Sequence, residues 1–312
     1  MAPSADFARR MVERFGAERF RSEVPLAALT TFKVGGPAEW LLETTSSDDL
    51  LEALRVACDS GVGVTMLGGG SNVLIGDKGV RGLVIKQRSG QIEQLASNLV
   101  RADAATTING LVRWTVHRGI AGLEAWAGTP GTVGGAIYGN AHFGGRLIGD
   151  RVASVQLADR KGTTRDRSRE EMDFGYDRSR LQETGEVVLS AVFDVAIGDP
   201  MALREIARQS LAYRKRTQPL ETPSAGCIFQ NPPRAAVPAD IPASAGALVD
   251  RAGLKGEAHG GARVSTAHAN FIVNEGHATA ADIRSLIDMC RTRVGEQFGV
   301  TLLEEIVYVG DF

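Results

Sequence analysis

The sequence predicts a protein of mixed α and β structure, divided into two or three domains. Its 312 residues are 43% hydrophobic and 23% charged, which is enough apolar material for more than one core. Short apolar runs, typical of strands, alternate with longer segments whose apolar residues recur every three to four positions, typical of amphipathic helices. This alternation extends along the chain without internal repeats or low-complexity tracts.

The N-terminal region predicts a β-α-β-β unit. An amphipathic helix over residues 46–58 follows one apolar run, and further runs at 62–67 and 82–85 are typical of strands. Another amphipathic helix is predicted over residues 5–20. Cys58 falls on the apolar face of helix 46–58, so we expect it to be a core thiol.

The rest of the chain carries clear start signals for helices. Asp199 and Pro200 suit the N-cap and the first position of a helix, which we expect to end near Arg216. Cys290 lies on the apolar stripe of another predicted helix and is expected in the core. The remaining expected elements are a helix over 105–117, a hairpin of 152–158 and 163–167, a strand over 186–196, a helix over 279–298 and a closing strand over 300–309.

Composition and charge exclude several functional classes. The formal net charge is −2, so the basic surface typical of nucleic-acid binding is missing, and we expect no nucleic-acid partner. The three cysteines include no C-x-x-C pair and no Cys/His group at zinc spacing, which predicts no metal site and suits a reducing cytoplasm. Residues 1–21 lack the apolar region of a signal peptide, and no apolar run is long enough to cross a bilayer. We therefore expect a cytoplasmic protein without membrane insertion.

The most informative stretch runs from Leu67 to Asp77, between two predicted strands. Consecutive glycines leave the backbone free to adopt positive φ and to approach a ligand, and the N–H groups of such a turn can bind an anion. The short polar side chains that follow can hydrogen-bond phosphate. The stretch predicts either a ligand with phosphates or a tight turn, and both interpretations stay open at this point. Its candidate ligand-binding residues are Gly68, Gly69, Gly70, Ser71 and Asn72.

A second glycine-rich stretch, residues 127–141, favours the ligand. Pro130 suits the first turn of a helix, and the glycines after it would let a helix N-terminus meet a diphosphate. Neither stretch has a G-x-G-x-x-G that opens a helix or a G-x-x-x-x-G-K-[ST], so a Rossmann domain and a P-loop enzyme are both poorly supported. We therefore expect a nucleotide site built by some other fold. The candidates here are Thr129, Pro130, Gly131, Val133, Gly134, Gly135 and Asn140.

Three further places offer reactive side chains. Cys227 lies in a turn of small residues between prolines, where a thiol can act as a nucleophile or a proton donor. Glu304 and Glu305 are adjacent in the predicted closing strand, so one of them faces away from solvent or into a cleft. The polar loop 174–180, Phe-Gly-Tyr-Asp-Arg-Ser-Arg, is a suitable place for a functional arginine.

With these motifs in order, the chain resembles the UDP-N-acetylmuramate dehydrogenases, also called UDP-N-acetylenolpyruvoylglucosamine reductases. The resemblance extends from about Thr30 to Gly310. Each motif is modest by itself, but this many in one order are specific. The matching segments are 31–38, 68–72, 128–135, 174–176, 218–219, 224–226 with Phe229, 231–232, 252–256, 264–274 and the end of the chain around Glu305.

The resemblance implies an α+β fold, with a two-part FAD-binding domain of the vanillyl-alcohol-oxidase-like (PCMH-type) fold and a C-terminal α/β substrate-binding domain. On this basis we expect the FAD subdomains at 1–88 and 89–200 and the substrate domain at 201–312. It implies bound FAD, NADPH as the reductant, and UDP-N-acetylglucosamine enolpyruvate as the substrate, in peptidoglycan synthesis. The flavin N5 hydride would add to C3 of the enolpyruvyl ether, and C2 would be protonated. The short segment 179–186 resembles the family's second type, which lacks an extra substrate-capping loop.

The resemblance also implies three catalytic residues. Glu305 matches the family's catalytic Glu, which together with an arginine would stabilise the charge that develops at C2. Cys227 stands where the family usually has a serine proton donor, and a thiol, with an ordinary pKa of about 8.5, is a far better acid than an alcohol. The arginine departs from the pattern, because Asp177 follows Phe-Gly-Tyr directly and Arg178 comes one place later. One place turns a strand side chain to the other face, so either the backbone bulges to restore Arg178 or another cation substitutes; we expect Arg178.

Substrate contacts and alternatives complete the expectations. His268 and Asn231 match positions that contact the substrate diphosphate, Tyr176 is expected to bind substrate, and Lys215 or Arg214 would help.

One alternative is another flavin oxidoreductase of the same fold, although such enzymes often attach flavin to a His in the first glycine loop, which has none here. The other is a non-catalytic protein that binds a UDP-sugar or nucleotide. We expect a monomer.

Overall fold

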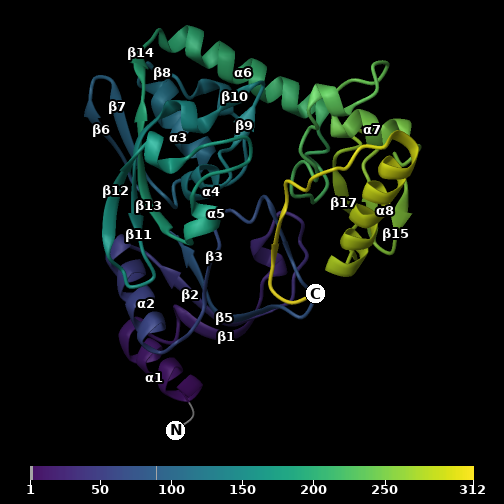
Figure 1. Ribbon diagram of the computed structural model, residues 1–312. Coiled ribbons are helices and arrows are strands. Elements are labelled where there is room, and N and C mark those ends of the chain that lie inside the picture. Colours follow the sequence, from purple (N-terminus) through teal and green to yellow (C-terminus); the bar gives the residue numbers. More distant parts are fainter. Residues whose placement is uncertain (1–2, 89) are drawn as a thin grey trace. The chain divides into compact units, whose positions relative to one another are not determined.

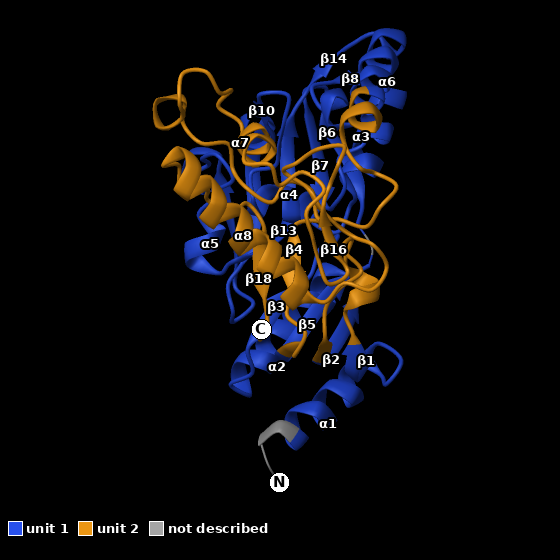
Figure 2. Ribbon diagram, turned by 90° about the vertical axis from the view of Figure 1, so that its right-hand side faces the viewer, with its two compact units in different colours: residues 1–24, 39–69, 81–212 blue, residues 25–38, 70–80, 213–312 orange. Residues whose placement is uncertain are grey.

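The structure is a computed structural model that describes residues 3–88 and 90–312. The chain forms two compact units, which Figure 2 colours separately. Two internal segments of the N-terminal region join the last hundred residues in the second unit, so the chain passes between the units several times. Unit 1 comprises residues up to 24, 39–69 and 81–212, and unit 2 comprises 25–38, 70–80 and 213–312. The expected boundaries near residues 88 and 200 stay a prediction.

The first sheet of the chain has four strands and is covered by two helices (Figure 1). Its elements are α1 (Pro3–Phe15), β1 (Phe20–Pro25), β2 (Pro37–Thr44), α2 (Ser47–Asp59), β3 (Val64–Met66) and β5 (Val80–Gln87). The strand order is β1-β2-β5-β3, with β3 and β5 parallel. α2 begins where the Ser46 side chain accepts a hydrogen bond from the Asp49 amide. The apolar faces of α1 and α2 share one core with the sheet, which includes Phe7 and Leu83.

The second sheet is five-stranded and antiparallel, and it also belongs to unit 1. Its strands, in the order β12-β11-β13-β7-β6, are β12 (Thr164–Ser168), β11 (Val152–Ala158), β13 (Val187–Asp194), β7 (Leu99–Asp103) and β6 (Ile92–Ala96). The helices α3 (Ile108–His117) and α4 (Val133–Tyr138) share its core, which includes Trp126 and Phe193. α4 lies against β13 and β7, and this contact fixes the second glycine-rich stretch on the sheet.

Unit 2 is built around one long helix and two small sheets. The elements are β4 (Val73–Ile75) paired in parallel with β18 (Val307–Val309), the sheet β15 (Ala258–His259), β16 (Ala262–Val264) and β17 (Ile272–Asn274), and the helices α7 (Ala245–Arg251) and α8 (Ala280–Phe298). Thr279 and Asp282 form a capping box at the start of α8, and Gly299 ends the helix at φ 68°. The Asp77 carboxylate accepts hydrogen bonds from the amides of Ala280 and Ala281. The segment that follows the first glycine loop is therefore anchored to the start of α8.

The other described elements are short, apart from one helix. They are β8 (Ile120–Ala121), β9 (His142–Phe143), β10 (Arg146–Leu147), α5 (Leu181–Thr184), β14 (Ala196–Ile197), α6 (Pro200–Thr217) and 3-10 turns over 27–29, 124–126, 148–151, 170–172 and 234–236. Asp199 accepts hydrogen bonds from the Met201 and Ala202 amides, so the predicted start of α6 is confirmed. Within residues 3–88 and 90–312, no helix has the length and apolarity needed to cross a membrane.

Two expectations about local structure are wrong. Cys58 is exposed, because it lies about 100° further round α2 than Ala57, the last residue of the buried stripe. The closing strand is shorter than predicted, because only 307–309 pair with a strand, while Glu305 donates its amide to the Ile228 carbonyl. Cys290, by contrast, is buried as predicted, and burial raises the pKa of its thiol to about 12.

Candidate functional site

Within unit 1, Gly68 and Gly69 of the first glycine-rich stretch closely approach the second stretch. A Cβ atom on Gly69 would lie 2.7 Å from Cα of Gly131, and a Cβ atom on Gly68 would lie 2.7 Å from Oγ1 of Thr132. Backbone cannot yield to a side chain at that distance, so position 69 requires glycine. The sequence analysis treated the two loops separately, whereas in the structure their backbones pack against each other.

The first loop offers a run of backbone donors. Among the residues that the structure describes, no protein acceptor receives the amides of Gly68, Gly69, Gly70 or Ser71, and Gly70 has φ 64°. Consecutive N–H groups in such a turn bind anions. Lys86 adds a nearby ammonium, which donates to the Gly68 carbonyl at 2.6 Å, and burial lowers its pKa. The Cβ-free surface and this donor set fit the diphosphate of a dinucleotide such as FAD.

The second loop offers few free backbone N–H donors, and its main contribution is the shape of its backbone. The amides of Val133 and Gly134 donate to the Thr106 and Ala104 carbonyls, so both N–H groups are already engaged. Thr132 caps α4 by accepting from the Gly135 amide. Thr129 donates its amide to the Trp126 carbonyl, and Pro130 is exposed in the turn that follows. Contacts of these residues with a cofactor stay a prediction.

Asn140 ties three segments together. It is fully buried at φ 45°, its Nδ2 donates to the Gly175 carbonyl at 2.6 Å, and its Oδ1 accepts from the Gly149 amide at 2.9 Å. Both halves of the amide are therefore used inside the protein, and they fix the loop that contains Tyr176 and Asp177. These hydrogen bonds give Asn140 a structural role, and its contact with a cofactor stays a prediction.

Replacement of Asn140 tests that role. We expect Asn140→Ala to lower the free energy of unfolding by about 2–4 kcal/mol, because the part-buried Gly175 carbonyl and the buried Gly149 amide both lose their partners. Chemical denaturation of the purified variant measures the change. The control is Asn98→Ala, which removes an exposed amide side chain from a turn and should change stability by less than about 0.5 kcal/mol. Equal stabilities of the two variants would contradict the role.

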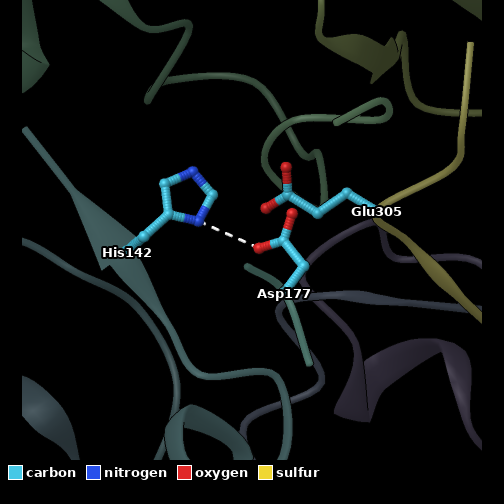
Figure 3. A group of neighbouring side chains, drawn as sticks. All are labelled: His142, Asp177 and Glu305. Carbon is cyan, nitrogen blue, oxygen red and sulfur yellow. Dashed lines mark hydrogen bonds and ion pairs between the residues drawn. The ribbon is translucent and has the colours of Figure 1, made fainter. Parts of the chain in front are cut away.

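In the loop 174–180, which resembles the family's arginine segment, the side chains of Asp177 and Arg178 have different partners, and Figure 3 shows Asp177 beside His142. Asp177 has φ 53°, and its Oδ1 lies 2.9 Å from Nδ1 of His142. The guanidinium of Arg178 instead pairs with Asp173 at 2.6 Å and Glu183 at 3.2 Å, on a side chain that is 50% exposed. The left-handed backbone of Asp177 is thus a local irregularity in the loop. The Arg178 side chain that follows it pairs with the carboxylates of Asp173 and Glu183.

Unit 2 brings the Cys227 turn and the Glu305 segment together. The Glu305 amide donates to the Ile228 carbonyl at 2.8 Å, and Nδ2 of Asn72 donates to the Glu305 carbonyl at 3.0 Å. Asn270 fixes the other side of the turn, where it bonds both the amide and the carbonyl of Phe229. Three residues predicted from separate motifs, Asn72, Cys227 and Glu305, therefore lie along one hydrogen-bonded strip. Sequence reasoning placed Asn270 inside the matching segment 264–274 but gave it no role of its own.

The basic end of α6 contains one buried and one exposed cation. The Arg214 side chain is buried at 6% exposure, whereas Lys215 is exposed. Burial lowers the pKa of Arg214 to about 10, and the charge of Cys227 acts in the opposite direction. Arg214 therefore lies within electrostatic range of Cys227.

Asn231 and His268 meet at the start of α7. Oδ1 of Asn231 accepts from the Ala245 amide at 3.0 Å, and a Cβ atom on Gly246 would lie 3.1 Å from Cε1 of His268. Nδ1 of His268 accepts from the Asn270 amide at 3.2 Å, which leaves the proton on Nε2. Burial, and then the charge of Lys255, lower the pKa of His268, so the neutral imidazole is favoured. Nε2–H is the donor that this residue can offer a ligand.

The chain is similar to known proteins over nearly its whole length. Residues 38–168 match a family model described as FAD binding domain, and residues 218–309 match one described as UDP-N-acetylenolpyruvoylglucosamine reductase, C-terminal domain. The UDP-N-acetylenolpyruvoylglucosamine reductase of Heliobacterium modesticaldum is 39% identical over 294 residues, which cover 94% of this chain and 91% of that protein. That of Parasynechococcus marenigrum is 43% identical over 294 residues, with 93% and 96% covered. The crystal structure of UDP-N-acetylenolpyruvylglucosamine reductase from Thermus caldophilus has a TM-score of 0.77 and 32% identity, and covers 93% of this chain and 99% of that chain.

Proposed function

Because this chain belongs to the UDP-N-acetylenolpyruvoylglucosamine reductase family, we propose that it reduces UDP-N-acetylglucosamine enolpyruvate to UDP-N-acetylmuramate, with bound FAD and with NADPH as the reductant. The fold is the expected one, an FAD-binding domain followed by the family's C-terminal domain. The observation of this structure that supports the reaction best is the strip that joins the Cys227 turn to Glu305. It brings the backbone of Ile228, the residue after Cys227, next to the backbone of Glu305 in the domain named for the enzyme.

Cys227 is the proposed proton donor. FAD, when bound, supplies a hydride to the double bond, and the neighbouring carbon must then receive a proton. Cys227 offers a thiol on a glycine turn, where Gly226 has φ 83° and a Cβ atom there would meet nothing within 4 Å. The turn is therefore open beside the thiol. A thiol is acidic enough to deliver its proton and is restored from solvent after each turnover.

Glu305 and Arg178 are proposed to act on the substrate carboxylate. Glu305 is held by its backbone at both sides, because its amide donates to Ile228 and its carbonyl accepts from Asn72. A backbone fixed in this way sets the direction of the Cα–Cβ bond of Glu305, from which the carboxylate can reach the substrate. Arg178 would have to exchange its ion pairs with Asp173 and Glu183 for one with the substrate carboxylate. This exchange is possible because all three side chains are at least half exposed.

The remaining proposed contacts divide between the cofactor and the nucleotide sugar. The first glycine loop, with Gly68, Gly69, Gly70, Ser71 and Asn72, would receive the FAD diphosphate. The substrate would be bound by Tyr176, Asn231, His268 and Lys215. The neutral imidazole of His268 presents an N–H, which suits a phosphate oxygen. We further propose that the protein is a cytoplasmic monomer.

Turnover tests the proposed function. Purified protein, reconstituted with FAD, should consume NADPH only when UDP-N-acetylglucosamine enolpyruvate is present, and mass spectrometry should find UDP-N-acetylmuramate in equal amount. NADPH consumption with oxygen alone would favour another flavin oxidoreductase of this fold. Tight substrate binding without NADPH consumption would favour a non-catalytic sugar-nucleotide protein.

A further inference from the structure

A lysine of the neighbouring strand holds the first carbonyl of the glycine loop in unit 1. The parallel strands β3 and β5 pair Met66 with Ile85, and the Leu67 amide donates to the Ile85 carbonyl at 2.9 Å. The loop therefore leaves β3 directly beside Lys86, the next residue of β5. Nζ of Lys86 donates to the Gly68 carbonyl at 2.6 Å, a short distance that is typical of a hydrogen bond from a charged donor.

This hydrogen bond fixes the direction of the next amide. In a trans peptide group, the C=O of one residue and the N–H of the following residue lie in one plane and point in opposite directions. No cis peptide bond occurs in the part of the chain that the structure describes. Because the Gly68 carbonyl points at Lys86, the N–H of Gly69 points away from it, and none of the described protein acceptors receives that N–H.

Lys86 is a partly buried cation that lacks an ion pair. Among the described residues, the Gly68 carbonyl is the one hydrogen-bond acceptor of its ammonium. Burial, and then the charge of Arg88, lower the pKa of Lys86, while the charge of Glu43 acts in the opposite direction. Glu43 is itself paired with Arg21 at 2.9 Å and with Arg88 at 2.6 Å. An unbalanced positive charge beside an N–H that lacks an acceptor is an environment that suits an anion.

We propose that Lys86 is a positioning residue of the FAD site, which holds the Gly68–Gly69 peptide so that the N–H of Gly69 faces the cofactor diphosphate. Neither glycine has a Cβ atom to restrict its backbone, so this peptide could also turn over. The ammonium selects the orientation in which the N–H can donate to a phosphate oxygen, and the loop is then already arranged when FAD binds. The role rests on the proposed function, in which the first glycine loop receives the FAD diphosphate.

Titration of the apoprotein with FAD tests this role. Lys86→Met keeps an unbranched side chain and removes the ammonium, whereas Lys86→Arg keeps a cationic donor. We expect Lys86→Met to weaken FAD binding about 10- to 100-fold, the range of one hydrogen bond to a charged group, and Lys86→Arg to recover most of this loss. When FAD saturates the variant, NADPH should reduce the bound flavin at the wild-type rate, because Lys86 acts on the diphosphate end of the site.

The orientation of the peptide can be measured directly. In NMR spectra of isotope-labelled wild-type protein, the Gly69 amide proton should shift downfield when FAD binds, because it then donates to a phosphate oxygen. At saturating FAD this shift should be much smaller in Lys86→Met, whose Gly68–Gly69 peptide is no longer held in one orientation. A lysine that only attracted the phosphates by its charge would lower the affinity and leave this shift unchanged.

Lys161→Met is the matched control. Lys161 is exposed in the turn between β11 and β12 of the same unit, so the variant makes the same change in net charge away from the loop and should bind FAD like the wild type. Wild-type FAD affinity in Lys86→Met, a loss that Lys86→Arg does not restore, or an equal Gly69 shift in Lys86→Met would each overturn the role of Lys86 while the wild-type protein still binds FAD. A wild-type protein that takes up no FAD would overturn the proposed function and this role together.

Discussion

Cys227→Ala should reduce its FAD with NADPH at nearly the wild-type rate and return the electrons to substrate about 10²- to 10⁴-fold more slowly. This is the usual contribution of a positioned general acid. The first half-reaction moves a hydride to the flavin and needs no proton from the protein, whereas the second leaves a carbon that must be protonated. Anaerobic stopped-flow absorbance separates the two steps.

Matched cysteine variants make this result specific. Cys58→Ala removes an exposed thiol from the end of α2 and should leave both half-reactions unchanged. Cys227→Ser restores the residue that the family usually has at this turn, and it should retain much more of the second half-reaction than Cys227→Ala. Unchanged flavin reoxidation in Cys227→Ala would remove Cys227 from the mechanism.

Gly69→Ala should abolish most FAD binding. A Cβ atom at this position would lie 2.7 Å from the Gly131 backbone, so the two glycine loops have to separate. Overpacking of this kind costs about 1–3 kcal/mol, which corresponds to a loss of FAD affinity of about 5- to 150-fold. The flavin absorbance per mole of purified protein, and titration of the apoprotein with FAD, measure the loss.

Gly63→Ala is the matched control for this variant. It lies in the same segment of unit 1, just before β3, and a Cβ atom there would meet nothing within 4 Å. FAD content should therefore equal that of the wild-type protein. If Gly69→Ala also kept its full FAD content, the close pairing of the two loops would not be part of the cofactor site.

Elements with local signals were predictable from the sequence. Ser46, Asp199 and Thr279 start helices because their side chains satisfy backbone amides at the first turn, and such caps depend only on neighbours in the chain. The hairpin of β11 and β12 also forms as predicted, since a polar turn, Asp159 to Gly162, separates two alternating segments. The fold class followed from the order of the motifs and is confirmed.

Features that depend on contacts between distant segments were not predictable. The predicted closing strand was too long. The backbone of Glu305 pairs with the turn at Ile228, about 75 residues earlier in the chain, rather than with a neighbouring strand. The pairing of Asp177 with His142 joins residues 35 positions apart and carries no motif. The one sign of this pairing in the sequence was a departure from the family pattern, because Asp177 stands where the family usually has an arginine. The roles of the individual site residues stay predictions, since cofactor and substrate contacts decide them.

The most direct test of the whole account is the absorbance of the FAD-loaded protein under anaerobic conditions, first with NADPH and then with UDP-N-acetylglucosamine enolpyruvate. The account predicts a yellow protein that bleaches with NADPH and regains its colour with the substrate. A protein that bleaches but stays colourless with the substrate would contradict the proposed reaction while leaving the flavin site in place. A protein that takes up no FAD at all would contradict the claim that the paired glycine loops form an FAD site.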